Sequence, residues 1–182
     1  MKGFTRKDPL FSLCGLNCGL CSMKLGGHCG GCGFGNQSCK IARCSLEHGG
    51  MEYCFQCEEY PCARYRQADR YDLFITGQRR LADLDKAQKI GPEAYGREQE
   101  QKAALLADLL ERYNDGRRKT LYCLAVNLLE VGEVKKVVRQ LEQSPELAVA
   151  GIKEQAAFLA DRFQQLAEGK GLQLKLRRKP EG

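Results

Sequence analysis

The residues of this chain best suited to chemistry are its cysteines, because a cysteine thiolate can bind a metal ion or act as a nucleophile. The chain has 182 residues and 11 cysteines, and all but Cys123 fall in one segment between positions 14 and 62. So dense a cluster predicts either bound metal or a network of disulfides. The clustered residues are Cys14, Cys18, Cys21, Cys29, Cys32, Cys39, Cys44, Cys54, Cys57 and Cys62.

The spacing of these cysteines favours metal over disulfides. A C-x2-C turn presents two sulfurs to one ion, and two such pairs complete a tetrahedron of thiolates about 2.3 Å from zinc. Residues 1–13 are charged and are followed by no apolar stretch, so we expect a cytoplasmic protein whose thiols stay reduced. All ten clustered cysteines are therefore predicted metal ligands. Those in C-x2-C turns are Cys18 with Cys21, Cys29 with Cys32, and Cys54 with Cys57.

We expect zinc, with at least two ions per chain, because four cysteine pairs exceed the two that one tetrahedral site uses. Iron–sulfur clusters take the same ligands and are the alternative, with a redox or sensing role, although the ferredoxin run C-x2-C-x2-C-x3-C-P is absent. The spacing of Cys14, Cys18 and Cys21 also occurs in radical S-adenosylmethionine enzymes. The alternating strands and helices of those enzymes are not predicted here.

Both histidines, His28 and His48, lie in the cysteine segment. We interpret them as surface imidazoles, and as further metal ligands only in second place. A zinc ion closed by four thiolates leaves no position for water or substrate, so we expect a structural metal rather than an enzyme. Its expected role is to fold the segment into a surface that recognises another protein.

The net charge of +6 does not by itself indicate binding to nucleic acid. Residues 170–182 carry five basic residues and one acidic residue, and thiolate ligands would lower the net charge further. We therefore expect weak nucleic-acid binding at most. No apolar run approaches the ~18 residues of a membrane span, so no membrane association is expected. The sequence leaves the oligomeric state open.

The elements that position the cysteines are predicted from glycine content and hydrophobic periodicity. Glycine-rich loops with short β-hairpins, near Phe11–Leu13 and Glu52–Phe55, are expected up to residue 62. Beyond it, apolar residues at spacings of three and four predict helices. Strict alternation over Leu172–Leu176 predicts a short strand. The predicted helices cover about 63–90 with a break at Gly77, 92–113, a buried segment at 120–131, and 144–169. Pro92 is expected to open the second of them, and Ser144 followed by Pro145 is expected to cap and open the last.

These elements predict an α+β protein of two parts. Residues 1–62 would form a loop-rich module that binds several metal ions and contains short β-hairpins. Residues 63–182 would form a helical part, ending in a short strand and a basic tail, on which that module packs.

The cysteine motifs resemble those of a bacterial and archaeal family called domain of unknown function 3795. The resemblance rests on CGLNCGLC at 14–21, CGGC at 29–32 and YCFQCEEYPC at 53–62. The segments FITGQRRLADLDKA at 74–87 and YNDGRRKTLYCLAVNLL at 113–129 look like the helical extension of longer members. The resemblance implies a cysteine-rich module that binds zinc, and it supplies no established activity and no catalytic residue.

Overall fold

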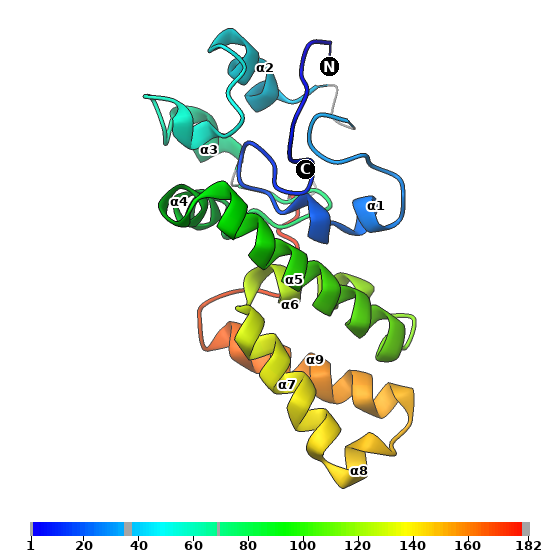
Figure 1. Ribbon diagram of the computed structural model, residues 1–182. Coiled ribbons are helices and arrows are strands. Elements are labelled where there is room, and N and C mark those ends of the chain that lie inside the picture. Colours follow the sequence, from blue (N-terminus) through cyan, green and yellow to red (C-terminus); the bar gives the residue numbers. More distant parts are fainter. Residues whose placement is uncertain (1, 35–37, 69, 180–182) are drawn as a thin grey trace. The chain divides into compact units, whose positions relative to one another are not determined.

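The computed structural model describes residues 2–34, 38–68 and 70–179, which include every cysteine of the chain. Within these residues there are nine α-helices, two 3-10 helices and no β-strand (Figure 1). The expected α+β class is therefore wrong, and the described part of the chain is all-α. None of these helices combines the length and the apolar character needed to cross a membrane.

Short helices separated by loops carry the cysteines, and longer helices follow. The first elements are η1 (Cys18–Leu20), α1 (Ser22–Leu25), α2 (Lys40–Glu47), η2 (Cys54–Gln56) and α3 (Ala63–Ala68). The later ones are α4 (Arg80–Ile90), α5 (Pro92–Arg112), α6 (Lys119–Leu128), α7 (Val131–Gln143), α8 (Pro145–Ala148) and α9 (Ile152–Glu168).

The chain forms two compact units. One contains the residues up to Gln99 together with those from Leu176 onward, and the other contains Glu100–Lys175. The first boundary falls within α5, so the second unit is an insertion in the sequence of the first. The predicted division of the chain into a metal-binding module at 1–62 and a helical part at 63–182 stays a prediction.

The core of the first unit fixes the loop that carries Cys14 and Cys18. The ring of Phe11, 1% exposed, packs against that of Tyr95 in α5 with centroids 4.6 Å apart. Asn17 donates from Nδ2 to Asp83 Oδ2 of α4 at 3.0 Å, and accepts at Oδ1 from the Tyr95 hydroxyl at 3.1 Å. All three polar side chains are buried, so this network holds the cysteine loop against two helices.

In the second unit α7 and α9 pack against each other and against the buried helix α6 (Figure 1). Tyr122–Leu128 of α6 are all buried, which confirms the buried helix predicted near 120–131. Tyr122 packs edge-on against Phe163 of α9, with ring centroids 6.2 Å apart, and donates to the Tyr113 carbonyl at 2.8 Å. The long aromatic side chain thereby fills the core without leaving its hydroxyl unpaired.

Helix boundaries follow the predicted capping signals in part. Ser144 accepts a hydrogen bond from Leu147 N at 3.3 Å and Pro145 takes the first helical position, as predicted. This helix ends at Ala148, however, and a new one begins at Ile152 after Gly151. The amphipathic helix α7, between Val131 and Gln143, was not predicted as a separate element.

The predicted β-elements are replaced by turns and irregular chain. At Phe11–Leu13 the backbone bonds locally, with Ser12 N donating to Leu16 O at 2.8 Å, and Glu52–Phe55 runs into the 3-10 turn η2. Leu172–Leu176 buries Leu174 but pairs with no neighbouring strand in the described structure. A strand needs a ladder of backbone partners, which alternation of side chains does not supply.

Candidate metal centre

Two of the three C-x2-C segments fold as the same 3-10 turn. Cys18 begins η1 and Cys21 follows it, just as Cys54 begins η2 and Cys57 follows it. In each turn the amide of the second cysteine donates to the carbonyl of the first, at 3.1 Å and 3.0 Å respectively. The backbone thus holds each pair of cysteines close, which is the local geometry that a chelating pair needs.

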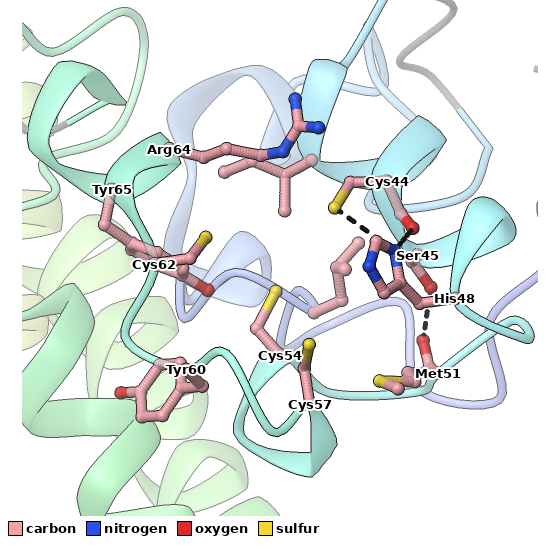
Figure 2. A pocket seen from close by; sticks show the side chains of 12 residues that line it. Cys44, Ser45, His48, Met51, Cys54, Cys57, Tyr60, Cys62, Arg64 and Tyr65 are labelled. Atoms are coloured by element: carbon pink, nitrogen blue, oxygen red, sulfur yellow. Dashed lines mark hydrogen bonds between the residues drawn. The ribbon is translucent and has the colours of Figure 1, made fainter.

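Four cysteines from three separate segments line one cavity of about 30 Å³ in the first unit (Figure 2). Cys54 and Cys57 come from η2, Cys44 from α2, and Cys62 from the residue before α3. Leu13 and Ile41 form part of the apolar wall. Four predicted ligands therefore border one cavity, although they are up to 18 positions apart in the sequence.

A second group of cysteines surrounds Cys18. Its pKa is raised by burial and then by the neighbouring charges that Cys32, Cys14 and Cys21 would carry. Cys39, the N-cap of α2, lies near enough to Cys32 to act on that thiol in the same way. Cys14 acts on Cys54 as well, so it stands between the two groups.

Cys29 and several sulfurs of this second group accept hydrogen bonds from nearby donors. The amide of Gly31 donates to Cys29 Sγ at 3.4 Å, and the amide of Ala42 donates to Cys39 Sγ at 3.4 Å. The amides of Cys32 and Leu13 bond to the sulfurs of Cys18 and Cys32 respectively. Amide donors aimed at sulfur favour a thiolate, because a neutral thiol is only a weak acceptor.

Gly31 is required by the geometry of this loop. It has φ +94°, and a Cβ atom there would lie 2.5 Å from the Pro9 carbonyl oxygen. Only glycine tolerates both the backbone conformation and the close approach. The glycine-rich loop around Cys29 and Cys32 is therefore shaped by packing against the N-terminal segment.

Burial opposes the ionisation of Cys54, which lines the cavity, and of Cys32 in the second group. It raises the pKa of Cys54 to about 12, although the side chain of Tyr65 acts in the opposite direction. It also raises the pKa of Cys32 to about 11, against the amide of Leu13 and the charge of Arg6. These thiols are therefore neutral at pH 7 unless a nearby positive charge compensates their burial.

The two histidines differ in their relation to the thiols. His28 is exposed in the loop after α1. His48, at the end of α2, is exposed too, but its ring borders the cavity (Figure 2). Its Nδ1 lies 2.8 Å from the Cys44 carbonyl oxygen and 3.7 Å from Cys44 Sγ. The carbonyl contact makes Nδ1 the donor nitrogen, so this atom bonds to the backbone of α2.

The thiols border a common space without yet converging on one point. Among residues 2–34, 38–68 and 70–179, no group of three or more His, Cys, Asp or Glu side chains is arranged to hold a metal ion. Cysteine has a single side-chain torsion before its sulfur, with three staggered positions. Rotation about that torsion is therefore the movement by which the four sulfurs would approach one another.

Comparison with known proteins gives no relative. No model of a protein family, no curated protein and no solved structure matches this chain. The resemblance of the cysteine motifs to domain of unknown function 3795 stays a prediction.

One residue of the site was missed by sequence reasoning. Tyr65 lines the cavity and is 3% exposed. It follows Cys62 by three positions, and its amide donates to the Cys62 carbonyl at 3.1 Å. Residues three apart in a helical turn lie on the same side, so the spacing from Cys62 is the signal that points to it.

Proposed function

We propose that this chain is a zinc-binding protein that holds at least two ions through its clustered cysteines. The observation that carries the proposal is the cavity bordered by Cys44, Cys54, Cys57 and Cys62. Four thiols are the donor set that structural zinc prefers. The volume of this cavity, about 30 Å³, exceeds the 10–15 Å³ or so that one water molecule needs. A bare metal ion therefore fits.

Cys14, Cys18, Cys21 and Cys32 would hold a second ion. Two observations support this group. The cysteines lie close enough for the charge of one to raise the pKa of another, and backbone amides donate to the sulfurs of Cys18 and Cys32. Cys29 lies in the loop that carries Cys32, and Cys39 is the N-cap of α2. Both would be additional donors for these ions. When bound, each ion supplies positive charge that offsets the burial of its thiolates, and so stabilises the folded loops.

The metal-organised segment would act as a recognition module for another protein, in the cytoplasm. Three large apolar side chains near it are exposed: Tyr71 by 41%, Leu73 by 83% and Phe74 by 58%. The Phe74 carbonyl lies 3.8 Å from Cys21 Sγ, which joins this loop to the cysteines. A group of exposed apolar side chains is typical of a protein-binding surface rather than of one that binds nucleic acid.

The test is metal analysis of the full chain purified without oxygen. We expect a colourless protein with at least two zinc ions per chain. A brown protein that contains iron and sulfide would replace this proposal with the iron–sulfur alternative. One zinc ion or none would overturn the assignment of two sites.

A further inference from the structure

The hydroxyl of Tyr65 is a buried polar group that the fold leaves without a regular partner. The residue is 3% exposed, and its Oη finds no hydrogen bond of regular geometry among the described residues. Buried hydroxyls in folded proteins nearly always have a hydrogen-bond partner, so a buried hydroxyl without one needs an explanation. The side chain borders the cavity that the four cysteines line (Figure 2).

Cys54 lines the same cavity, and the side chain of Tyr65 extends toward it (Figure 2). A neutral thiol accepts hydrogen bonds weakly, whereas a thiolate accepts them strongly. A metal-bound cysteine is a thiolate, so a Cys54 that held a metal ion would be the stronger acceptor for this hydroxyl. The position of Tyr65 suits an ionised Cys54 better than a protonated one.

We propose that Tyr65 is a positioning residue of the site formed by Cys44, Cys54, Cys57 and Cys62, and that its hydroxyl donates a hydrogen bond to the Cys54 thiolate. The inference rests on the proposed zinc-binding function. Such a bond would orient the Cys54 side chain toward the other three sulfurs. It would also withdraw electron density from the Cys54 sulfur, which tunes the strength of the metal–sulfur bond.

Tyr60 offers a matched control in the same cavity. Its ring packs edge-on against that of Tyr65, with centroids 5.7 Å apart, and it lines the same cavity. Its hydroxyl, however, donates to Asp85 Oδ1 at 2.8 Å and so has a partner that is not a thiol. Removing the Tyr60 hydroxyl changes the same kind of residue without touching the sulfur.

The experiment compares the full-length wild-type chain with Tyr65→Phe and Tyr60→Phe. Zinc affinity is measured by competition with a chelator, and the cobalt-loaded proteins are examined by absorption spectroscopy. We expect Tyr65→Phe to weaken one site about 10- to 100-fold, the usual effect of losing an outer hydrogen bond to a metal ligand. The other site and the Tyr60→Phe protein should keep wild-type affinity.

The sulfur-to-cobalt charge-transfer band gives a readout that a purely structural role would not move. Loss of a hydrogen bond to the sulfur raises the energy of its electrons, so this band should shift to longer wavelength in Tyr65→Phe. If that variant does not fold, 3-fluorotyrosine at position 65 replaces it. Its hydroxyl is a stronger donor, and the band should then shift to shorter wavelength.

Two outcomes separate the inference from the function on which it rests. Equal zinc affinity and identical cobalt spectra for wild type and Tyr65→Phe would overturn the role of Tyr65 and leave zinc binding intact. A wild-type chain that binds neither zinc nor cobalt, or a Cys57→Ser chain that keeps its full metal content, would overturn the site itself.

Discussion

Asp72 and Arg177, 105 positions apart in the sequence, join the first unit to its last segment through side chains and backbone together. The Arg177 guanidinium donates to both carboxylate oxygens of Asp72, from Nη2 at 2.7 Å and from Nε at 3.2 Å. The Arg177 amide adds a third bond at 3.0 Å, and the Asp72 amide donates back to the Arg177 carbonyl at 2.8 Å. The Asp72 side chain is 1% exposed. The basic tail is therefore anchored at this residue.

This pair predicts a loss of stability in acid. Burial would raise the pKa of Asp72, but the bonds from Arg177 and from the Gly77 amide outweigh burial and lower it. A lowered pKa stabilises the fold above the ordinary aspartate value of 3.8, and that stabilisation disappears as the pH falls through the folded value. Arg177→Ala should reduce the free energy of unfolding at pH 7 by about 1–2 kcal/mol.

Chemical denaturation of wild type and Arg177→Ala between pH 7 and pH 2 measures this effect. The difference between the two proteins should shrink as the pH falls from about 4 through the lower folded-state pKa of Asp72, below which this carboxyl is protonated in both. Arg178→Ala is the matched control, because Arg178 is an exposed neighbour of the same charge. A difference that stays constant across this range would show that the ionised carboxylate does not provide the stabilisation.

Gly15 predicts a steric effect at the cysteine loop. Its φ is +88°, and a Cβ there would lie 2.3 Å from the Arg80 carbonyl oxygen. Gly116 has a similar φ of +89° but open space around it. We expect Gly116→Ala to cost about 1 kcal/mol from backbone strain alone. Gly15→Ala should reduce the stability by more than this and should lower the metal content too. Thermal unfolding and metal analysis of both variants measure the two effects. Equal stability and equal metal content in the two variants would contradict the prediction.

Loss of a ligand should separate the metal-dependent part of the chain from the rest. Cys57→Ser should lose at least one zinc ion and disorder the cysteine segment, while most helical signal in circular dichroism remains. The longer helices keep their packed apolar faces, whereas the cysteine loops depend on metal for folding energy. Cys18→Ser should behave in the same way.

Cys123→Ser is the control for these variants. Cys123 is buried in α6 of the second unit, away from the ten clustered cysteines in sequence. It should keep the full metal content. Wholesale loss of helix in Cys57→Ser would instead mean that the whole chain unfolds as one cooperative unit.

Nucleic-acid binding should be weak and steeply dependent on salt. Arg177 is engaged with Asp72, which leaves Lys175, Arg178 and Lys179 as exposed charges of the described tail. Phosphate contacts alone lose affinity as salt rises, by about 0.9 in the logarithmic slope for each contact. Replacing Lys175, Arg178 and Lys179 by alanine should abolish any residual binding in a mobility-shift assay. Sequence-selective binding that survives about 0.2 M salt would contradict this prediction.

The longer helices and their caps could be predicted because they depend on local pattern. Pro92 opens α5, Ser144 caps α8, and the apolar run over Tyr122–Leu128 is buried, each as the sequence indicates. The alternating leucines of 172–176 were misleading, since Leu174 is buried without a partner strand. Alternation reports which side chains are buried, and not whether a neighbouring backbone completes the ladder.

The grouping of the cysteines could be predicted only where it is local. The C-x2-C spacing indicates that Cys54 and Cys57 lie together, because their turn closes within four residues. That Cys44 joins them depends on where α2 packs, and Cys62 on the path before α3. Tyr65 was overlooked because its significance comes from its place beside Cys54 in the cavity, which no spacing between cysteines encodes.

The insertion of Glu100–Lys175 within the first unit has a consequence for synthesis on the ribosome. A chain emerges from its N-terminal end, so the cysteine segment and α4 appear early, and Arg177 appears only after the whole inserted unit. Asp72 therefore cannot bond to Arg177 until more than a hundred further residues have been synthesised. Nascent chains halted before Leu176 would contain every proposed zinc ligand and still lack the segment that completes their unit.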